Sequence, residues 1–206
     1  MKIKICGMTE ANNILEVSTL HPDYLGFIFH ESSSRYFKGI ISKVPESIKK
    51  TGVFVDSSFE TIENQINQHQ LDAVQLHGSE SPELCQRLKP KGVEVIKVFS
   101  VDDNFNFSNI EAYQGHCHYY LFDTKGKLPG GNGITFNWNV LESYNGSTPY
   151  FLSGGLGIEN LSDIKLFLQS PISDKCLGID LNSKFETAPG IKSKSKLTKF
   201  INQLKL

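Results

Sequence analysis

The sequence predicts a compact (β/α)8 barrel, and three observations lead to this fold class. Eight short apolar runs, rich in Val, Ile, Phe and Tyr, recur along the 206 residues. The segments between them are long enough to hold a helix, as connections between parallel strands require. Polar residues or glycines stand at the ends of the runs, where a barrel builds its active site. With no break in composition, we expect one barrel domain spanning residues 1–206.

The elements follow from these runs in chain order. The predicted strands are residues 2–6, 24–29, 51–55, 72–77, 93–99, 118–123, 149–154 and 176–181. Helices are predicted at 81–90, where Ser81 and Pro82 form a start signal, and at 195–204. Another is predicted within 157–171, with one apolar face made of Ile158, Leu161, Ile164, Leu166 and Leu168. Asp, Asn and Ser crowd residues 100–114, so we expect the fifth helix to be short or irregular.

An open doubly wound sheet is the competing fold. The chain is close to the lower limit of about 200 residues for a barrel. No apolar run has the character of an additional edge strand, however, and the polar strand ends match the needs of a barrel mouth. The barrel is therefore the preferred prediction.

Charge and composition exclude several classes of function. The formal net charge is −1, from 21 basic and 22 acidic side chains, so neither nucleic acid nor an anionic membrane is an expected partner. No apolar run approaches the roughly 20 residues that span a bilayer, and the N-terminal segment is unlike a signal peptide. We expect a cytoplasmic protein. Its four cysteines contain no C-x-x-C pair, so no metal site is predicted.

Two residues at strand ends have the chemistry of a base and an acid. Cys6 ends "KIKIC"; a lone cysteine there is more often inert, but a strand end at the mouth can leave it partly exposed. Its ordinary pKa of about 8.5 would then need only modest lowering for the thiol to be largely thiolate at neutral pH. Asp123 ends "YYLFD", where a carboxyl can retain a proton among apolar neighbours or can simply cap the next loop. Together they would suit an isomerase.

Other candidates surround this pair. His77 and Asp56 end two further strands, and Arg35 in "HESSSRYF" is either a solvated side chain or a clamp for a carboxylate or phosphate. The backbone of Gly154, Gly155 and Leu156 in "SGGLGIEN" could approach a phosphate, since the loops after strands 7 and 8 often bind one. Residues 126–133, "GKLPGGNG", are expected to be a mobile loop over the mouth.

The ordered motifs resemble those of one enzyme family. These are "KICGMT", "SSRYF", "GVFVD", "VQLHG", "LFDT" with "GGNGITFNW", "LSGGL", and "GIDLNSKFE" with "PGIK". They resemble, from Lys4 to Lys192, the signatures of phosphoribosylanthranilate isomerase, an enzyme of tryptophan biosynthesis. No single motif carries the resemblance, which rests on their order and spacing.

The resemblance implies a reaction and a set of roles. The substrate would be N-(5-phosphoribosyl)anthranilate and the product 1-(2-carboxyphenylamino)-1-deoxy-D-ribulose 5-phosphate, formed by an Amadori rearrangement. Cys6 would be the general base, Asp123 the general acid, and Arg35 the partner of the anthranilate carboxylate. No cofactor is implied, because the iminium intermediate is itself the electron sink. A monomer and a homodimer both remain open for this chain.

Further residues complete the expected site. The phosphate loops would comprise Gly154, Gly155 and Leu156 after strand 7, and Asn182 and Ser183 after strand 8. His77 and Asp180 would lie at the barrel mouth.

Three positions depart from the common family pattern: Ser34 stands in place of proline, Asn132 in place of threonine, and "NSK" at 182–184 in place of Ser-Ser-Gly. Two alternatives stay open beside this resemblance. The histidine-pathway aldose–ketose isomerase uses paired aspartates, whereas this chain has Cys6 on its first strand. The other alternative is a catalytically silent sugar-phosphate binding module.

Overall fold

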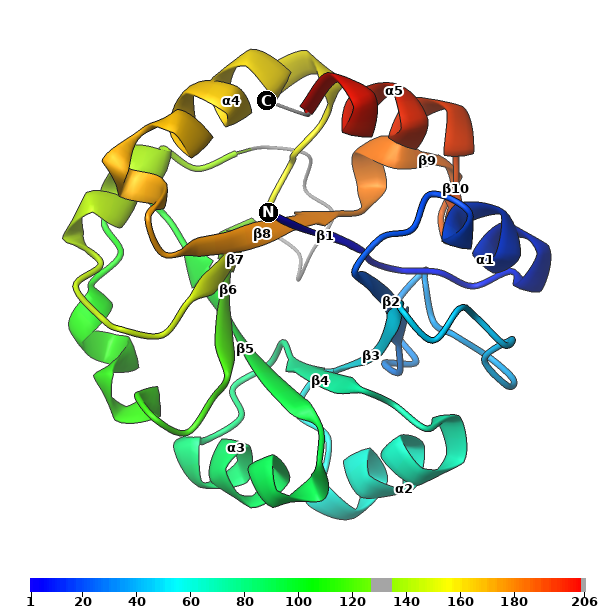
Figure 1. Ribbon diagram of the computed structural model, residues 1–206. Helices are drawn as coiled ribbons and strands as arrows, with labels where there is room; N and C mark the ends of the chain where they lie inside the picture. Colours follow the sequence, from blue (N-terminus) through cyan, green and yellow to red (C-terminus); the bar gives the residue numbers. More distant parts are fainter. Residues whose placement is uncertain (127–134, 205–206) are drawn as a thin grey trace.

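The eight predicted strands form a closed parallel barrel in the computed structural model, which describes residues 1–126 and 135–204. Figure 1 looks along the barrel and shows the strands as an inner ring with the helices outside it. The strands are β1 (Lys2–Ile5), β2 (Tyr24–Ile28), β3 (Lys49–Phe54), β4 (Ala73–Leu76), β5 (Glu94–Val101), β6 (Tyr119–Thr124), β7 (Tyr150–Leu152) and β8 (Cys176–Leu181). β1 pairs with β8 and closes the ring, which confirms the predicted fold class.

Five α-helices cover the outside of the barrel. They are α1 (Ala11–Ser18), α2 (Phe59–His69), α3 (Pro82–Leu88), α4 (Leu161–Gln169) and α5 (Lys194–Leu204). The hydroxyl of Ser58 caps α2 by accepting from the N–H of Thr61, and Ser81 caps α3 in the same way. The predicted start signal at 81–82 is therefore confirmed.

Short 3-10 helices make up the other helical segments of the described residues. They are η1 (Lys89–Lys91), η2 (Phe107–Tyr113), η3 (Trp138–Ser143), η4 (Ile158–Asn160), η5 (Pro171–Ser173) and η6 (Ser183–Phe185). The irregular fifth helix is confirmed, since η2 connects β5 to β6. Polar residues, Gly39 and Pro45 interrupt the β2–β3 connection, and it contains no helix, contrary to the regular alternation that we expected.

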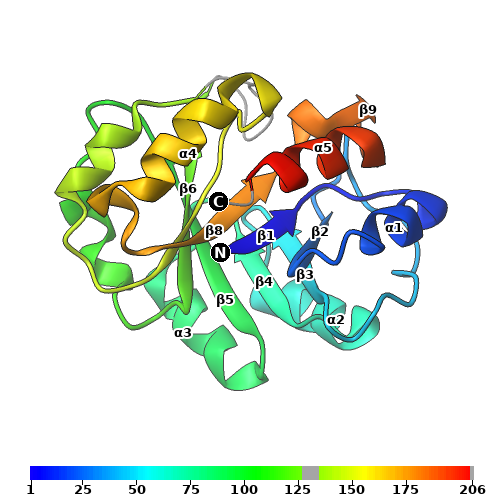
Figure 2. The same ribbon diagram turned by 45° about the horizontal axis from the view of Figure 1, so that its top comes forward.

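A short hairpin was not predicted. β9 (Glu186–Ala188) and β10 (Ile191–Lys192) pair antiparallel after β8. Both views place β9 next to α5 (Figures 1 and 2). This hairpin brings Glu186 and Lys192 back toward the barrel mouth.

The apolar face predicted for the helix at 157–171 was partly wrong. Ile164 is buried, but Leu166 is 67% exposed, and Phe167 packs inward instead. The α-helix begins only at Leu161, after the 3-10 turn η4. Within α4, Leu166 follows Ile164 by two residues and so points about 200° away from it, whereas Phe167 follows by three and returns to the buried face.

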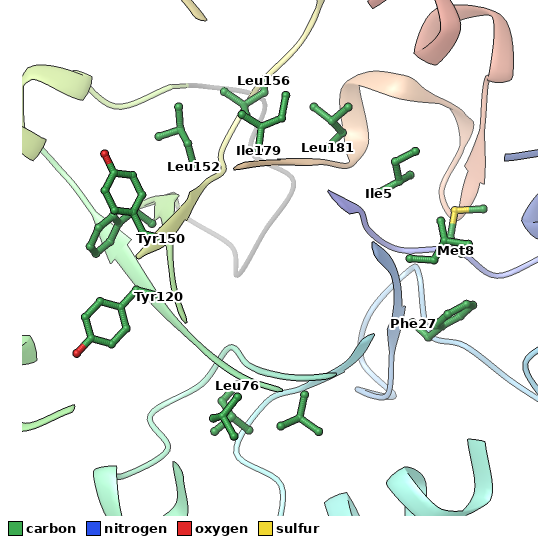
Figure 3. Close-up of a cluster of buried hydrophobic side chains, with 14 of the residues drawn as sticks. Ile5, Met8, Phe27, Leu76, Tyr120, Tyr150, Leu152, Leu156, Ile179 and Leu181 are labelled. Carbon is green, nitrogen blue, oxygen red and sulfur yellow. The ribbon is translucent and has the colours of Figure 1, made fainter. Parts of the chain in front are cut away.

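Strand alternation divides the buried side chains into two layers. Figure 3 shows the outer layer, in which side chains such as Phe27, Leu76 and Tyr120 point away from the ring toward the helices. The smaller inner layer fills the barrel and consists of Tyr24, Ala73, Ile96, Val98, Leu121 and Phe151. Because successive strand residues point to opposite sides, the residues that alternate with the outer layer reach the barrel interior and its mouth.

Among the helices of residues 1–126 and 135–204, none combines the length and the hydrophobicity needed to cross a membrane.

A buried ion pair on the outer side of β5 gives a stability prediction. The Lys97 ammonium donates to a Glu80 carboxylate oxygen at 3.0 Å and to the carbonyls of Leu76 and Gly78. Replacing Lys97 by Met removes one partner and leaves Glu80 uncompensated, so Lys97→Met should lower the free energy of unfolding by about 3–5 kcal/mol. Urea denaturation followed by circular dichroism measures this loss.

The matched control is the exposed pair between Lys125 and Asp102. Water screens this pair, and Lys125→Met should leave the free energy of unfolding almost unchanged. Equal losses in the two variants would contradict the structural role given to Lys97.

Candidate active site

The predicted site residues line one cavity of about 530 Å³ at the carboxyl ends of the strands. The structure brings together Cys6, Arg35, His77, Asp123, Gly154, Gly155, Leu156, Asp180, Asn182 and Ser183. Asp56 is outside this set: its backbone has a φ of +49°, and its carboxylate accepts the N–H of Ser79. It therefore shapes the turn after β3.

Cys6 lies just beyond β1, on its inner face. Gly7 turns the chain away with a φ of +75°, a conformation that favours glycine. On the neighbouring strand, a Cβ at Gly26 would lie 2.7 Å from the Cys6 sulfur, so this glycine leaves the space that the thiol occupies. The side chain is nevertheless only 3% exposed, and the partial exposure that we expected was wrong.

Burial decides the protonation of the free thiol. It raises the pKa of Cys6, while the nearby ammonium groups of Lys4 and Lys192 oppose this rise. The expected lowering is therefore not observed.

An ion pair lies inside the barrel below Cys6. The Lys4 ammonium donates to the Asp180 carboxylate at 2.8 Å, and the two residues are register partners on β1 and β8. Desolvation opposes the charge on Lys4, but the charges of Asp180 and Cys6 outweigh it and raise the pKa of Lys4. The sequence reasoning missed Lys4, although its spacing of two from Cys6 places both on one strand face.

Asp123 faces a histidine at the mouth. Its Oδ2 lies 3.5 Å from Nε2 of His77, and its Oδ1 accepts the N–H of Thr124. The Nδ1 atom of the same imidazole lies 3.2 Å from the amide nitrogen of Gln75. The Gln75 side chain thus holds the imidazole on the side away from Asp123. Gln75 was also missed, and again strand alternation places it beside His77.

Arg35 reaches the cavity from the β2–β3 connection and is fixed there by Glu186. Its Nε and Nη2 donate to the two carboxylate oxygens of Glu186 at 2.8 and 2.7 Å. Lys192 donates to the same carboxylate and to the Asn182 side chain. Although desolvation acts the other way, these two cations lower the pKa of Glu186. The guanidinium keeps Nη1 for a further acceptor.

Two loops after β7 and β8 offer backbone donors. Gly154 has a φ of +90°, and a Cβ there would lie 2.1 Å from the Thr124 hydroxyl, so the close approach of these loops requires glycine. The N–H groups of Gly155 and Ser183 donate no hydrogen bond to another described residue. Lys184 also lines the cavity, where its ammonium pairs with Glu159 at 2.5 Å.

Two features lie outside this constellation. Residues 127–134 are not among the described residues, so the predicted mobile loop and the departure at Asn132 cannot be placed. A second hollow of about 820 Å³ lies between η2 and η3 and is lined by Phe107, Tyr120 and Tyr144, among others. It contains none of the predicted site residues.

Comparison with known proteins decides which family has this arrangement. The family model described as N-(5'-phosphoribosyl)anthranilate (PRA) isomerase matches residues 3–203. The N-(5'-phosphoribosyl)anthranilate isomerase of Phocaeicola vulgatus is 44% identical over 205 residues, covering 100% of this chain and 98% of that protein. The chain belongs to the phosphoribosylanthranilate isomerase family. Both the resemblance and the predicted activity, an aldose–ketose isomerase of tryptophan biosynthesis, are confirmed.

Solved structures of phosphoribosylanthranilate isomerases share the fold over their whole length. The Thermotoga maritima enzyme is 30% identical, with a TM-score of 0.82 over 100% of this chain and 98% of that one. Another, in complex with reduced 1-(o-carboxyphenylamino)-1-deoxyribulose 5-phosphate, is 28% identical with a TM-score of 0.80 and the same coverage. A further structure describes monomers made from the dimeric Thermotoga maritima isomerase.

Proposed function

We propose that Cys6 and Asp123 perform the proton transfers of this isomerase, as general base and general acid. The observation that carries the proposal is that both face the inside of the barrel and line one cavity, at the ends of β1 and β6, which β7 and β8 separate in the ring (Figure 1). A substrate held between them would present different atoms to each group.

The reaction opens the sugar ring before it moves the carbonyl. Asp123 gives a proton to the ring oxygen, the bond from that oxygen to C1′ breaks, and the nitrogen lone pair forms the iminium. The Cys6 thiolate then takes the C2′ proton. The electron pair of the broken C2′–H bond passes into the iminium and gives an enolamine. Ketonisation adds one proton at C1′ and removes one from the 2′-hydroxyl, so the overall reaction is proton-neutral.

His77 would orient the acid in this scheme. Its Nε2 faces the Asp123 carboxyl while Gln75 fixes the other side of the ring. Replacement of a residue that acts only by orienting the acid should lower kcat more than it raises KM.

The two ends of the substrate would use different walls of the cavity. Arg35 retains Nη1 for the anthranilate carboxylate, and an Arg–carboxylate contact is a strong charge-assisted bond. The backbone N–H groups of Gly155 and Ser183 would donate hydrogen bonds to the phosphate, and the neighbouring Gly154, Leu156 and Asn182 shape the loops. The complex of the relative cited above contains a ligand with these two anionic ends.

The clamp role gives a prediction for binding. Arg35→Ala should raise KM by about tenfold or more, because it removes a charge-assisted contact of about 1.5–3 kcal/mol. Glu186→Gln should cause a smaller rise, because it frees the guanidinium without removing it. Steady-state kinetics of both variants measure these changes.

The control variant replaces a nearby cation outside the clamp, Lys184→Met, which breaks the pair with Glu159. If KM responds to Lys184→Met but not to Arg35→Ala, the carboxylate is held elsewhere.

Two further expectations belong to this proposal. We expect the protein to act in the cytoplasm. The dimeric Thermotoga maritima relative makes a homodimer one of the two expected states, and sedimentation equilibrium would separate it from a monomer.

Complementation tests the function directly. The gene should restore growth without tryptophan to a strain that lacks only this isomerase step, and the Cys6→Ala variant should not. Failure by the well-expressed unaltered protein would instead favour a catalytically silent binding module.

A further inference from the structure

Lys4 is a charged side chain of the barrel interior that has no part in the proposed reaction. It is fully buried, and it lies two residues before Cys6 on the inner face of β1. Burying an ammonium group is costly, and it is tolerated where the group is paired. The partners of Lys4 therefore indicate its role.

The first partner fixes the ammonium group in place. The Asp180 carboxylate accepts from Nζ at 2.8 Å, and both residues belong to the hydrogen-bonded strand pair that closes the barrel. The backbone continues this pairing one step further, since the N–H of Cys6 donates to the carbonyl of Leu181 at 2.9 Å. Lys4 and Cys6 are thus held on one rigid pair of strands.

The second partner is Cys6 itself. Residues two apart on a strand are separated by about 6.6 Å along the strand axis, a span that an extended lysine side chain covers. Burial raises the pKa of Cys6, and the charge of the Lys4 ammonium is the strongest influence that lowers it. Gly26 on the adjacent strand keeps the sulfur in this position by leaving it room.

Other charged groups face Cys6 from the elements around it. Arg35 approaches from the β2–β3 connection and Lys192 from β10, but both donate to the Glu186 carboxylate, which offsets their charge. Asp180 on β8 acts in the opposite sense, since its negative charge disfavours a thiolate. Across the mouth, Asp123 and His77 face Asp180.

We propose that Lys4 is a positioning residue for the base, whose buried ammonium supplies the counter-charge for the Cys6 thiolate while Asp180 anchors it. The thiol proton leaves to bulk water through the open cavity, and Lys4 stays protonated throughout. The inference rests on the proposed role of Cys6. The Lys4 ammonium explains how a thiol that is shielded from solvent can lose its proton and act as a base.

The test measures the thiol without turnover. The rate of Cys6 alkylation by iodoacetamide is followed against pH by mass spectrometry of the Cys6 peptide, in substrate-free protein. Lys4→Met keeps the length of the side chain and removes the charge. Loss of an adjacent opposite charge shifts a pKa by about 1–3 units, so alkylation below the pKa should slow by about tenfold or more. An unchanged profile in folded Lys4→Met protein would overturn the proposal.

Asp180→Asn is the matched comparison, because it removes the other charge of the same pair. It should shift the alkylation profile toward lower pH, opposite to Lys4→Met. A general loosening of the barrel would move both variants in the same direction, and that result would also overturn the proposal. The acidic limb of the kcat/KM profile should follow the alkylation profile in Lys4→Met protein.

A folding defect would not end the test. If Lys4→Met does not fold, the double variant Lys4→Met with Asp180→Asn removes both charges and leaves none unpaired. Its alkylation profile should still lie at higher pH than that of the unaltered protein, because the charge of Lys4 acts on Cys6 more strongly than the opposite charge of Asp180; no rise would refute the role of Lys4. If Cys6→Ala retains turnover while Lys4→Met shifts the alkylation profile, Lys4 does stabilise the Cys6 thiolate. In that case Cys6 is not the general base.

Discussion

Cys6→Ala should lower kcat by about 10²- to 10⁴-fold, the usual contribution of one positioned proton transfer. The substitution removes the atom that takes the C2′ proton, while the neighbours that bind the substrate stay in place. KM should change much less than kcat. The fold should persist, because the change deletes one sulfur atom from the wall of an open cavity. Steady-state kinetics and thermal unfolding of the purified variant measure both quantities.

Cys176→Ala is the matched control for this prediction. Cys176 is also a free cysteine, but it begins β8 at the opposite end of the barrel from the cavity. Its thiol contacts the carbonyl of Gly178 and not the site. Turnover should therefore be unaffected in Cys176→Ala protein. Wild-type turnover in the Cys6 variant would remove Cys6 from the mechanism.

Asp123→Asn should lower kcat by a similar factor, about 10²- to 10⁴-fold, because an amide cannot supply the proton that opens the ring. The amide has the same shape as the carboxyl and can still accept the N–H of Thr124. Ring opening would then become limiting, and the substrate should accumulate in its closed form. Quenched-flow analysis of the bound species would show this accumulation.

The control keeps the same chemical change and moves it away from the site. Asp174→Asn alters an exposed carboxylate just before β8, at the far end of the barrel, and should leave kcat unchanged. If Asp123→Asn protein opened the ring at the normal rate, another group would have to be the acid.

The strand pattern allowed much of the fold to be predicted. Each apolar run was short, β-branched or aromatic, and followed by a polar or glycine residue, and these local signals specify strands and their ends. Helix boundaries were less certain, because residues 158–160 form a 3-10 turn before α4 begins. Leu166 is exposed because it lies two residues after the buried Ile164, on the opposite side of α4.

The site could be predicted as a set of residues but not as a network. Cys6, His77 and Asp123 stand at strand ends, and the closed ring of strands was enough to bring them to one mouth. Glu186 fixes Arg35 across 151 positions of the chain, on a hairpin that no local signal announced. The spacing of residues in the sequence therefore could not identify Glu186 as the partner of Arg35.

The sequence by itself determined the order of strands, the residues at their ends and, through ordered motifs, the family. Those properties depend on local periodicity and on short segments, which a linear chain displays directly. Only the tertiary structure decided how deeply Cys6 is buried, and which charges surround it. Burial and charge pairing depend on side chains from β1, β2, β8 and the β9–β10 hairpin meeting in space, and the free energy of a buried charge depends on all of them together.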